Sequence, residues 1–540
     1  MKLSLPFRST YVLNYLLLVL LLFISGCAQH KKSIFIDSSN GTCNQYSTCF
    51  QAVRNDLYKG LDGKICQKLN SLDTEMQKKH QYDDGFADDM GMLNLLEISS
   101  LYLHTGIPDK SLEYSRYSEC LIEKREDEPQ LWELLRKGGS AIGSLAGGQN
   151  YSVYDPVGYE RVLLLNIQAM DYLLKGDERA FNVALKSSDW QDLEREKFEK
   201  QIEAVKKSSK KNIGKKDNQE AYVDPKQKKK NKKIKSKVFA KLTREFAKYN
   251  RKALKVPSAF VNPFGDYLAG VVKEYKSVDA DFRSQMDNAR IHYNKARKLN
   301  PKSRVLKLAY KDAKKRRSAK RLVHIVAFDG FVPEKNILRF DIKLRQCPIP
   351  IHIELPVYDP VKSRVHRIVA STTGGRILAT FWPVADVEAL ALRHQKDMLP
   401  VIQALVAVAA IRDAALQVGK LAVSEAVKKK YGGTPGVSMA FDKLVGGLMN
   451  VLDKNLEPDT SSWMSLPKRI LAARFHPPKH LKTIVITSYD AKGRRLARQK
   501  VKLGKGGRHF IFVRTTNKAM KVIKGKPIWS PKEKIKRIDC

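Results

Sequence analysis

The chain has 540 residues and a hydrophobic fraction of 43%, so it is long enough for two or three globular domains. Its seven cysteines include no C-x-x-C pair, which excludes a zinc ribbon and a thioredoxin-like motif. The formal net charge is +43, and the excess is concentrated in residues 206–237 and 468–540. Such segments indicate an acidic partner, for example anionic lipid, lipopolysaccharide or a wall polymer.

The first 26 residues are predicted to be a lipoprotein signal peptide. Lys2 and Arg8 give a positive start, and residues 12–24 form an apolar stretch that is too short to span a bilayer comfortably. The sequence "ISGC" then places two small residues directly before Cys27, which resembles the bacterial lipobox. The resemblance implies that the Cys27 thiol receives a diacylglycerol. An ordinary signal peptide with an incidental cysteine is the alternative.

Ala28 follows Cys27. By the enterobacterial sorting rule, the resemblance implies an outer-membrane lipoprotein that faces the periplasm and carries fatty acyl chains such as palmitate. Two or more acyl chains make such an anchor stable. An exported chain does not normally meet nucleic acid, so nucleic acid is not expected as a partner. Residues 27–56 are polar and are predicted to be a tether.

Four cysteines after the anchor lie in the N-terminal third: Cys43, Cys49, Cys66 and Cys120. An exported compartment permits disulfides, so one or two structural disulfides are expected among these four. Their pairing stays open, because cysteine positions alone do not determine it.

Residues 57–190 have a helical pattern that includes two tetratricopeptide-like (TPR-like) fragments. The first fragment comprises Leu95, Ile98, Ser99, Tyr102, Gly106 and Ser111. In the second, Tyr172 and Gly176 stand as Tyr102 and Gly106 do, and Asp177 is a plausible cap for the next helix. A third fragment, in residues 258–317, comprises Ala289, Tyr293, Ala296 and Pro301. Three fragments favour a helical-repeat array over an unrelated bundle.

A lysine-rich insertion, residues 191–257, separates the second and third fragments. Its lysine run consists of Lys226, Lys228, Lys229, Lys230, Lys232, Lys233, Lys235 and Lys237. The flanks look helical, but the centre contains Pro225, Asn231 and few apolar residues, so it is predicted to be disordered. These lysines are candidates for contact with an anionic envelope surface. A solvated insertion without a partner is the alternative.

After Arg317 the hydrophobic period changes, and residues 318–515 are predicted to be a β-rich domain. Strands are expected in 322–331, 337–345 and 349–358, and again in 480–515 around turns at 490–493 and 504–507. A helical segment, 383–456, lies between the two strand groups. Its apolar part contains Pro400 and Arg412, which favours a buried helix over a membrane span. Residues 516–540 are predicted to be a basic tail.

Three stretches carry a resemblance to a known family: 158–177, 262–275 and 459–478. Together with the lipobox, they resemble an uncharacterised family of bacterial lipoproteins that have a TPR-like N-terminal region and a β-rich C-terminal region. The chain departs from that family at Ser461, where an arginine is usual, and in its long lysine insertion. The resemblance implies work in the cell envelope and brings no established catalytic residues. The predicted fold class is therefore α+β.

Motifs for catalysis are absent from the sequence: it has no H-E-x-x-H, no G-x-S-x-G and no phosphate-binding loop. His476 and His480 are close in sequence, but no Cys, Asp or Glu is near them, so no metal site and no cofactor are expected. Trp463 is expected to be a buried anchor between the helical segment and the last strands.

These observations favour a non-enzymatic scaffold whose TPR-like groove holds an envelope protein. A periplasmic enzyme that acts on peptidoglycan or envelope glycan through a noncanonical site is the alternative.

Overall fold

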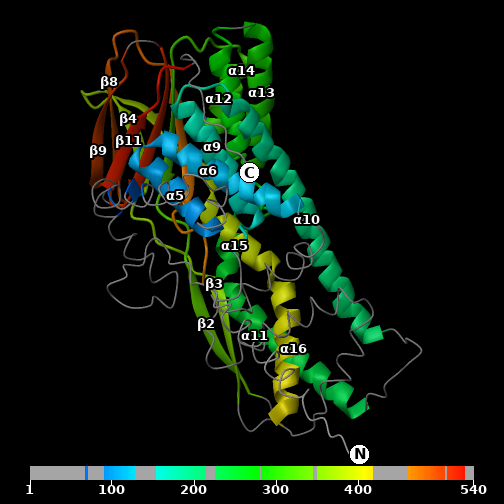
Figure 1. Cartoon of the computed structure of the whole chain (residues 1–540). Helices are drawn as coiled ribbons and strands as arrows, with labels where there is room; N and C mark the ends of the chain where they lie inside the picture. The colour runs from blue at the N-terminus through cyan, green and yellow to red at the C-terminus, as the bar shows by residue number, and fades with distance from the viewer. Residues whose placement is uncertain are drawn as a thin grey trace, which may run out of the picture. The chain divides into compact units, whose positions relative to one another are not determined.

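The computed structural model describes residues 91–127, 154–214, 225–279, 281–343, 350–417, 460–504, 507–517 and 519–528, with a few isolated positions between Leu57 and Thr74 (Figure 1). Cys27 lies outside the described residues, as does the rest of the predicted leader and tether. All described residues belong to one compact unit. They have an α+β fold, which confirms the predicted fold class in its coarse form.

Helices make up the first part of the described chain. Their bounds are α5 (Met92–Thr105), α6 (Pro108–Asp127), α9 (Gly158–Leu174), α10 (Ala180–Gly214), α11 (Pro225–Ala253), α12 (Phe264–Lys276), α13 (Phe282–Leu299) and α14 (Arg304–Lys314). Several consecutive helices pack against each other: α5 with α6, α9 with α10, α12 with α13, and α13 with α14. In α13, Met286, Ala289, Tyr293 and Ala296 recur at helical spacing and are fully buried. This apolar stripe packs α13 against its neighbours α12 and α14.

The turns that join α5 to α6 and α9 to α10 have the same backbone geometry. Gly106 and Gly176 have φ angles of 93° and 70°, a region that glycine adopts without strain. The amide that follows the glycine donates to the tyrosine carbonyl in both turns: Ile107 N to Tyr102 O at 2.9 Å, and Asp177 N to Tyr172 O at 2.8 Å. The correspondence of the two Tyr-x3-Gly patterns therefore holds in three dimensions.

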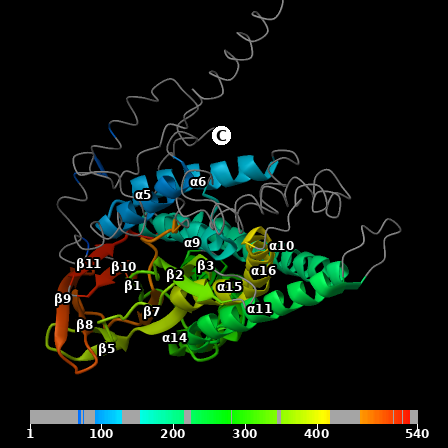
Figure 2. The same cartoon turned by 90° about the horizontal axis from the view of Figure 1, so that it is seen from below.

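The lysine run forms the first half of α11, so the prediction of a disordered centre is wrong. Ile234, Val238, Leu242 and Phe246 recur every four residues and are at most 3% exposed. This stripe packs against α15 (Val387–Asp397) and α16 (Leu399–Gln417), and Figures 1 and 2 show α11 beside α16. Apolar residues in this segment are few, but their spacing puts them on one face of the helix. Residues 215–224 lie outside the described residues.

Two sheets and a hairpin follow. The five-stranded sheet has the order β11-β10-β1-β7-β6, and its strands are β1 (Leu322–Asp329), β6 (Trp382–Asp386), β7 (Arg469–Phe475), β10 (Arg508–Thr516) and β11 (Ala519–Lys524). The four-stranded sheet has the order β5-β4-β8-β9, with β4 (Arg367–Ser371), β5 (Ile377–Thr380), β8 (Thr483–Tyr489) and β9 (Arg495–Lys502). The hairpin pairs β2 (Lys335–Ile342) with β3 (Ile351–Tyr358).

The five-stranded sheet is covered on both faces, which explains why every residue of β1 is buried. Val323, Ile325 and Ala327 belong to a core shared with the four-stranded sheet. The alternate residues Val326 and Phe328 belong to the core that the helices form. Successive side chains of a strand point to opposite faces, so the described chain has three layers: helices, five-stranded sheet and four-stranded sheet.

Several predicted boundaries change. The helical segment predicted for 383–456 begins with β6, continues as α15 and α16, and then leaves the described residues at 418. The tail predicted for 516–540 is wrong for Ala519–Lys524, because β11 pairs with β10 there. α14 ends and β1 begins on either side of Arg317, but the helices before Arg317 and the five-stranded sheet after it share a core, so the two parts are not separate domains. Among the described residues, no helix is both long and apolar enough to cross a membrane.

Candidate functional site

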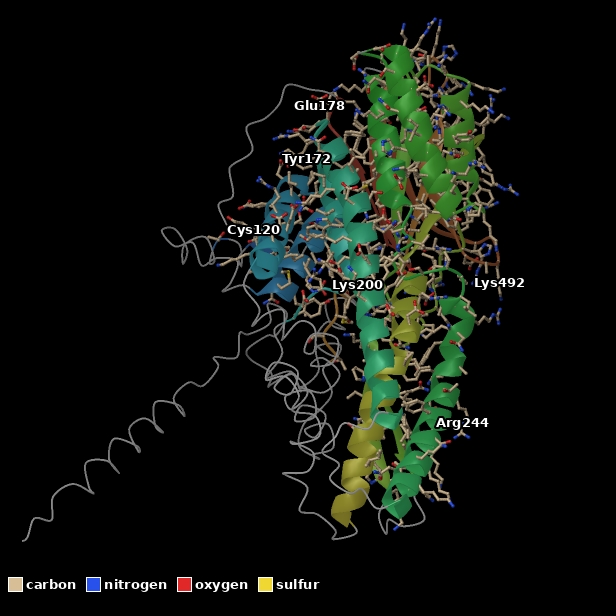
Figure 3. The ribbon with its side chains drawn as sticks, turned by 90° about the vertical axis from the view of Figure 1, so that its right-hand side faces the viewer. Cys120, Tyr172, Glu178, Lys200, Arg244 and Lys492 are labelled. Atoms are coloured by element: carbon tan, nitrogen blue, oxygen red, sulfur yellow. The ribbon has the colours of Figure 1, made fainter. Side chains whose placement is uncertain are left out.

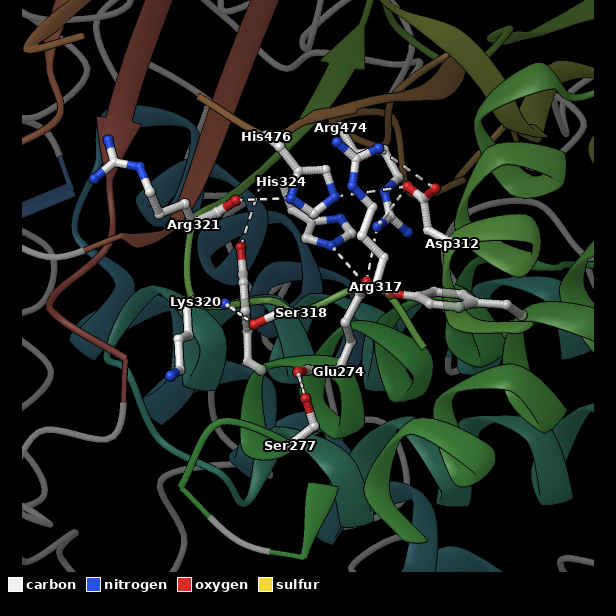
Figure 4. A network of polar contacts seen from close by, with 12 residues as sticks. Glu274, Ser277, Asp312, Arg317, Ser318, Lys320, Arg321, His324, Arg474 and His476 are labelled. Atoms are coloured by element: carbon white, nitrogen blue, oxygen red, sulfur yellow. Dashed lines mark hydrogen bonds and ion pairs between the residues drawn. The ribbon is translucent and has the colours of Figure 1, made fainter. Parts of the chain in front are cut away.

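A cluster of ionisable side chains lies between α12 and the helix-facing side of the five-stranded sheet (Figure 4). His324 on β1 and Arg474 on β7 stand opposite each other in the antiparallel ladder. Residues paired in this way point to the same face of the sheet. That face meets α12, and Glu274 on α12 contacts both side chains. The register of β1 against β7 therefore creates this cluster.

Glu274 is the centre of the cluster. Its Oε1 accepts a hydrogen bond from Arg474 Nη2 at 2.7 Å, and its Oε2 accepts one from the Tyr293 hydroxyl at 2.6 Å. His324 Nε2 lies 3.2 Å from Oε2, and His324 Nδ1 lies 2.9 Å from the Tyr267 hydroxyl. Since a carboxylate only accepts, Nε2 carries the histidine proton and Tyr267 donates to Nδ1. The Glu274, His324 and Arg474 side chains are all 0% exposed.

The cluster continues to the surface through α14. Arg474 Nη2 is also 3.2 Å from Asp312 Oδ2, and His476 Nε2 lies 3.7 Å from the same oxygen. Arg317, whose side chain is 57% exposed, lies 3.9 Å from the other oxygen of Asp312. We call Glu274, Tyr293, Asp312, His324 and Arg474 the buried network. It joins α12, α13 and α14 to β1 and β7.

The protonation states follow from burial and charge. Burial would raise the pKa of Glu274, but Arg474 and His324 lower it to about 2. Burial lowers the pKa of His324 to about 4, although its hydrogen bond to Glu274 opposes this. Burial disfavours the charge on Arg474, yet Glu274 raises the pKa of the guanidinium. Burial would raise the pKa of Asp312, but His476 and Arg474 lower it. At neutral pH the buried network therefore holds two ionised carboxylates, a guanidinium and a neutral histidine.

The shifted pKa of His324 predicts a loss of stability in acid. The folded pKa is about 4 and the ordinary value is 6.5, so the unfolded chain binds the proton first as the pH falls. The stability is fully present above pH 6.5 and is lost as the pH falls toward 4. The shift corresponds to a loss on the order of 3 kcal/mol in the free energy of unfolding.

Urea unfolding at several pH values checks this prediction. The variant His324→Gln should lack the loss between pH 6.5 and 4, whereas His480→Gln, at an exposed position, should retain it. Equal pH dependence in the wild type and His324→Gln would contradict the assignment. Below pH 4 both proteins should still lose stability, because the Glu274 contribution disappears as the pH falls through about 2.

A second set of buried contacts holds the loop that precedes β7. Glu97 on α5 accepts from Met464 N at 2.6 Å and from Ser465 N at 3.0 Å. Trp463 Nε1 donates to Ser100 Oγ at 2.9 Å, and Trp463 is 0% exposed. Trp463 is thus buried as predicted. However, its hydrogen bonds join it to Ser100 on α5, to Ser465 in its own loop and, through its backbone amide, to the Tyr154 hydroxyl. They tie the loop to α5 rather than to the helical segment.

The predicted contact lysines lie along one side of α11. Lys229, Lys230, Lys232, Lys233 and Lys237 are exposed. Lys235 is half-buried, and its ammonium lies 5.3 Å from the centre of the Phe239 ring. The side chains of Lys226 and Lys228 lie outside the described residues. Arg244, labelled in Figure 3, continues the basic surface further along the helix. The helix therefore presents a row of cations opposite its apolar stripe.

The histidines and cysteines give no metal site in the described part of the chain. His476 contacts Asp312 and the Arg321 carbonyl, whereas His480 is exposed. No group of three or more His, Cys, Asp or Glu side chains could hold a metal ion in that part. Cys120 is disulfide-bonded, and the other six cysteines lie outside the described residues.

Comparison of the chain with family models, with curated proteins and with solved structures gives no match. A proposal for the function therefore has to be argued from the residues of this chain. The buried network has its three central side chains closed to solvent, so a substrate does not reach them in this conformation. What these contacts do is fix the helical layer on the sheet. A buried ion pair adds little net stability but strongly penalises the loss of either partner.

Proposed function

We propose that the chain is an envelope lipoprotein that is anchored through Cys27 to the outer membrane, faces the periplasm and acts as a non-enzymatic scaffold for another envelope protein. The observation that supports this best is the complete burial of Glu274, His324 and Arg474. These side chains tie helices to a sheet, which suits a rigid support. The lipobox supports the anchor.

In this proposal the helix pairs are TPR-like units whose groove receives the partner. The matched turns at Gly106 and Gly176 support it. Close helix contacts support it further. A Cβ atom added at Gly270 would lie 2.5 Å from the Tyr293 ring, so glycine allows α12 to approach α13 closely. Ser111 is small and buried, and its hydroxyl donates to Asp171 on the next helix at 2.8 Å.

The anchor is tested by Cys27→Ser. The variant should carry no fatty acyl label and should leave the membrane fraction, because the thiol that receives the lipid is gone. Metabolic fatty-acid labelling followed by membrane fractionation measures both. Cys120→Ser serves as the control, and its label should equal that of the wild type. Persistent labelling of Cys27→Ser would contradict the anchor.

The scaffold role is tested by crosslinking in intact cells. The wild type should yield a discrete crosslinked species with one envelope protein, and Cys27→Ser should lose it because the chain no longer concentrates at the membrane. The purified protein should release no fragments from peptidoglycan. Release of fragments would support an enzyme and contradict the scaffold.

We also propose that the lysine side of α11 contacts an anionic membrane surface. Each lysine close to such a surface contributes on the order of 1 kcal/mol, and the attraction decays within a Debye length. The variant with glutamine at Lys229, Lys230, Lys232 and Lys233 should bind phosphatidylglycerol vesicles at least tenfold more weakly at low salt. Vesicle co-sedimentation of a Cys27→Ser background measures this. Equal binding of the variant and its parent would leave α11 as a solvated helix.

A further inference from the structure

The outer face of the four-stranded sheet is defined by the register of β8 against β9. Ile484 pairs with Val501 and Ile486 with Gln499, and Ile484, Ile486 and Val501 belong to the core between the sheets. The alternate pairs therefore point outward. These outward pairs are Thr483 with Lys502, Val485 with Lys500 and Thr487 with Arg498. On β9 the outward residues thus form a row of three cations.

The segments that form this sheet have a strong excess of positive charge. Residues 362–380 contain four lysines and arginines, and residues 478–504 contain eight, whereas Asp490 is the single acidic residue in both ranges. The carboxylate of Asp490 already accepts from Arg494 Nε at 2.8 Å and from the Lys492 amide at 2.9 Å. Arg498, Lys500 and Lys502 are exposed. Within the part of the chain that the structure describes, none of these three forms an ion pair with a carboxylate.

The spacing of the three cations favours a linear anionic partner. Alternate residues of a strand are about 7 Å apart, so the row is straight and about 14 Å long. A polymer with repeated phosphate groups can lie along it and contact several cations in turn. On the neighbouring strand β8, Thr487 is only 4% exposed, whereas the half-buried Thr483 adds a hydroxyl group beside Lys502 at one end of this row. Hydroxyl groups can donate to phosphate oxygens and can pair with sugar hydroxyls.

The same face is less suited to nucleic acid. Proteins that bind single strands use aromatic rings as stacking platforms for the bases. Tyr489 lies on this face opposite Arg367, and the Arg367 guanidinium already lies 5.1 Å from the centre of its ring. On this face Val485 and Thr487 of β8 are buried, so the exposed part is the row on the edge strand β9. We propose that this row binds a phosphate-bearing glycan polymer through Arg498, Lys500 and Lys502. This proposal goes beyond the scaffold role and does not depend on the Cys27 anchor.

The test compares Arg498→Gln/Lys500→Gln/Lys502→Gln with its parent, the full exported chain carrying Cys27→Ser. The probe is a phosphorylated mannan, and binding is titrated between 50 and 200 mM salt. The logarithm of affinity falls with the logarithm of salt by roughly 0.7 per neutralised charge on a single-stranded polyanion. Loss of three contacts should make that slope shallower by about 2. Between 50 and 200 mM salt, the factor by which affinity falls should then be roughly 20 times smaller for the variant than for its parent.

The matched control is Lys307→Gln/Lys311→Gln/Lys314→Gln on α14, where three exposed lysines give the same loss of charge. This control should keep the parental slope, and unphosphorylated mannan should not bind. An equal change of slope in both variants would indicate attraction by net charge and would overturn the proposal. Tighter binding of a single-stranded oligonucleotide or of phosphatidylglycerol vesicles than of the phosphomannan would overturn the glycan assignment. An unchanged slope in the β9 variant would overturn the site.

Discussion

Arg474→Met should lower the free energy of unfolding by about 3–5 kcal/mol, because it leaves the Glu274 carboxylate buried without its cation. Methionine fills a similar volume, so the effect reports the loss of charge rather than a cavity. His324 and Tyr293 keep their hydrogen bonds to Glu274 and do not supply a charge at neutral pH. Urea unfolding of the purified Cys27→Ser chain measures the change.

Two companion variants make this result specific. Arg474→Met/Glu274→Gln removes the uncompensated charge of Glu274 and keeps an acceptor for Tyr293. Asp312 also loses Arg474 but still has Arg317 3.9 Å away, so the double variant should recover most of the loss. Arg339→Met breaks an ion pair with Glu354 in which the arginine is 59% exposed, and it should cost less than about 1 kcal/mol. A loss below about 1 kcal/mol for Arg474→Met, or no recovery in the double variant, would contradict a paired and charged Glu274.

Trp463→Ala should also destabilise the fold by about 3–5 kcal/mol, because it removes a large side chain that is 0% exposed. It also removes the indole N–H that donates a hydrogen bond to Ser100. Trp463→Phe keeps most of the buried surface and loses that hydrogen bond, so it should cost about 1–2 kcal/mol.

Thermal and urea unfolding distinguish the two Trp463 variants. The same loss in both would indicate that the hydrogen bond dominates. A loss below about 1 kcal/mol in the alanine variant would contradict the role of the loop as an anchor on α5.

The sequence predicts the strands whose pattern is local. The apolar runs in β1 and β8 and the alternation at the start of β3 indicate strands without any tertiary information. The strands β4 to β7 and β11 were not predicted. β5 and β6 have only four and five residues, and β6 contains Pro383. β7 is buried on both faces, so its sequence shows no alternation.

The lysine run shows how composition can mislead. Eight lysines in residues 226–237 suggested disorder, yet four apolar residues at fixed spacing decide the structure of α11 because α15 and α16 cover them. Apolar residues that recur on one face of a helix decide whether the segment folds, even in a lysine-rich segment, when another surface covers that face. That partner surface lies more than 130 residues further along the chain and is not visible in a local reading.

The buried network could not be predicted as a unit. Glu274, His324 and Arg474 are far apart in sequence, and only the register of β1 with β7 and the packing of α12 bring them together. A signal did exist for two of them. His324 interrupts the apolar run LVHIVAFD, and Arg474 interrupts ILAARF. A polar side chain within a buried strand requires a hydrogen-bonding or charged partner. The positions of His324 and Arg474 therefore indicated that a helix covering the sheet carries a group such as a carboxylate.

Native-state hydrogen exchange tests most directly whether helices and sheet form the one rigid body that a scaffold requires. Amides of α12 and β1 should exchange with the same free energy of opening, equal to that of global unfolding. In Arg474→Met both sets should shift together by about 3–5 kcal/mol. Exchange of α12 at a lower free energy than β1, or a shift confined to one of the two, would show that the layers open independently and would contradict the tie through Glu274.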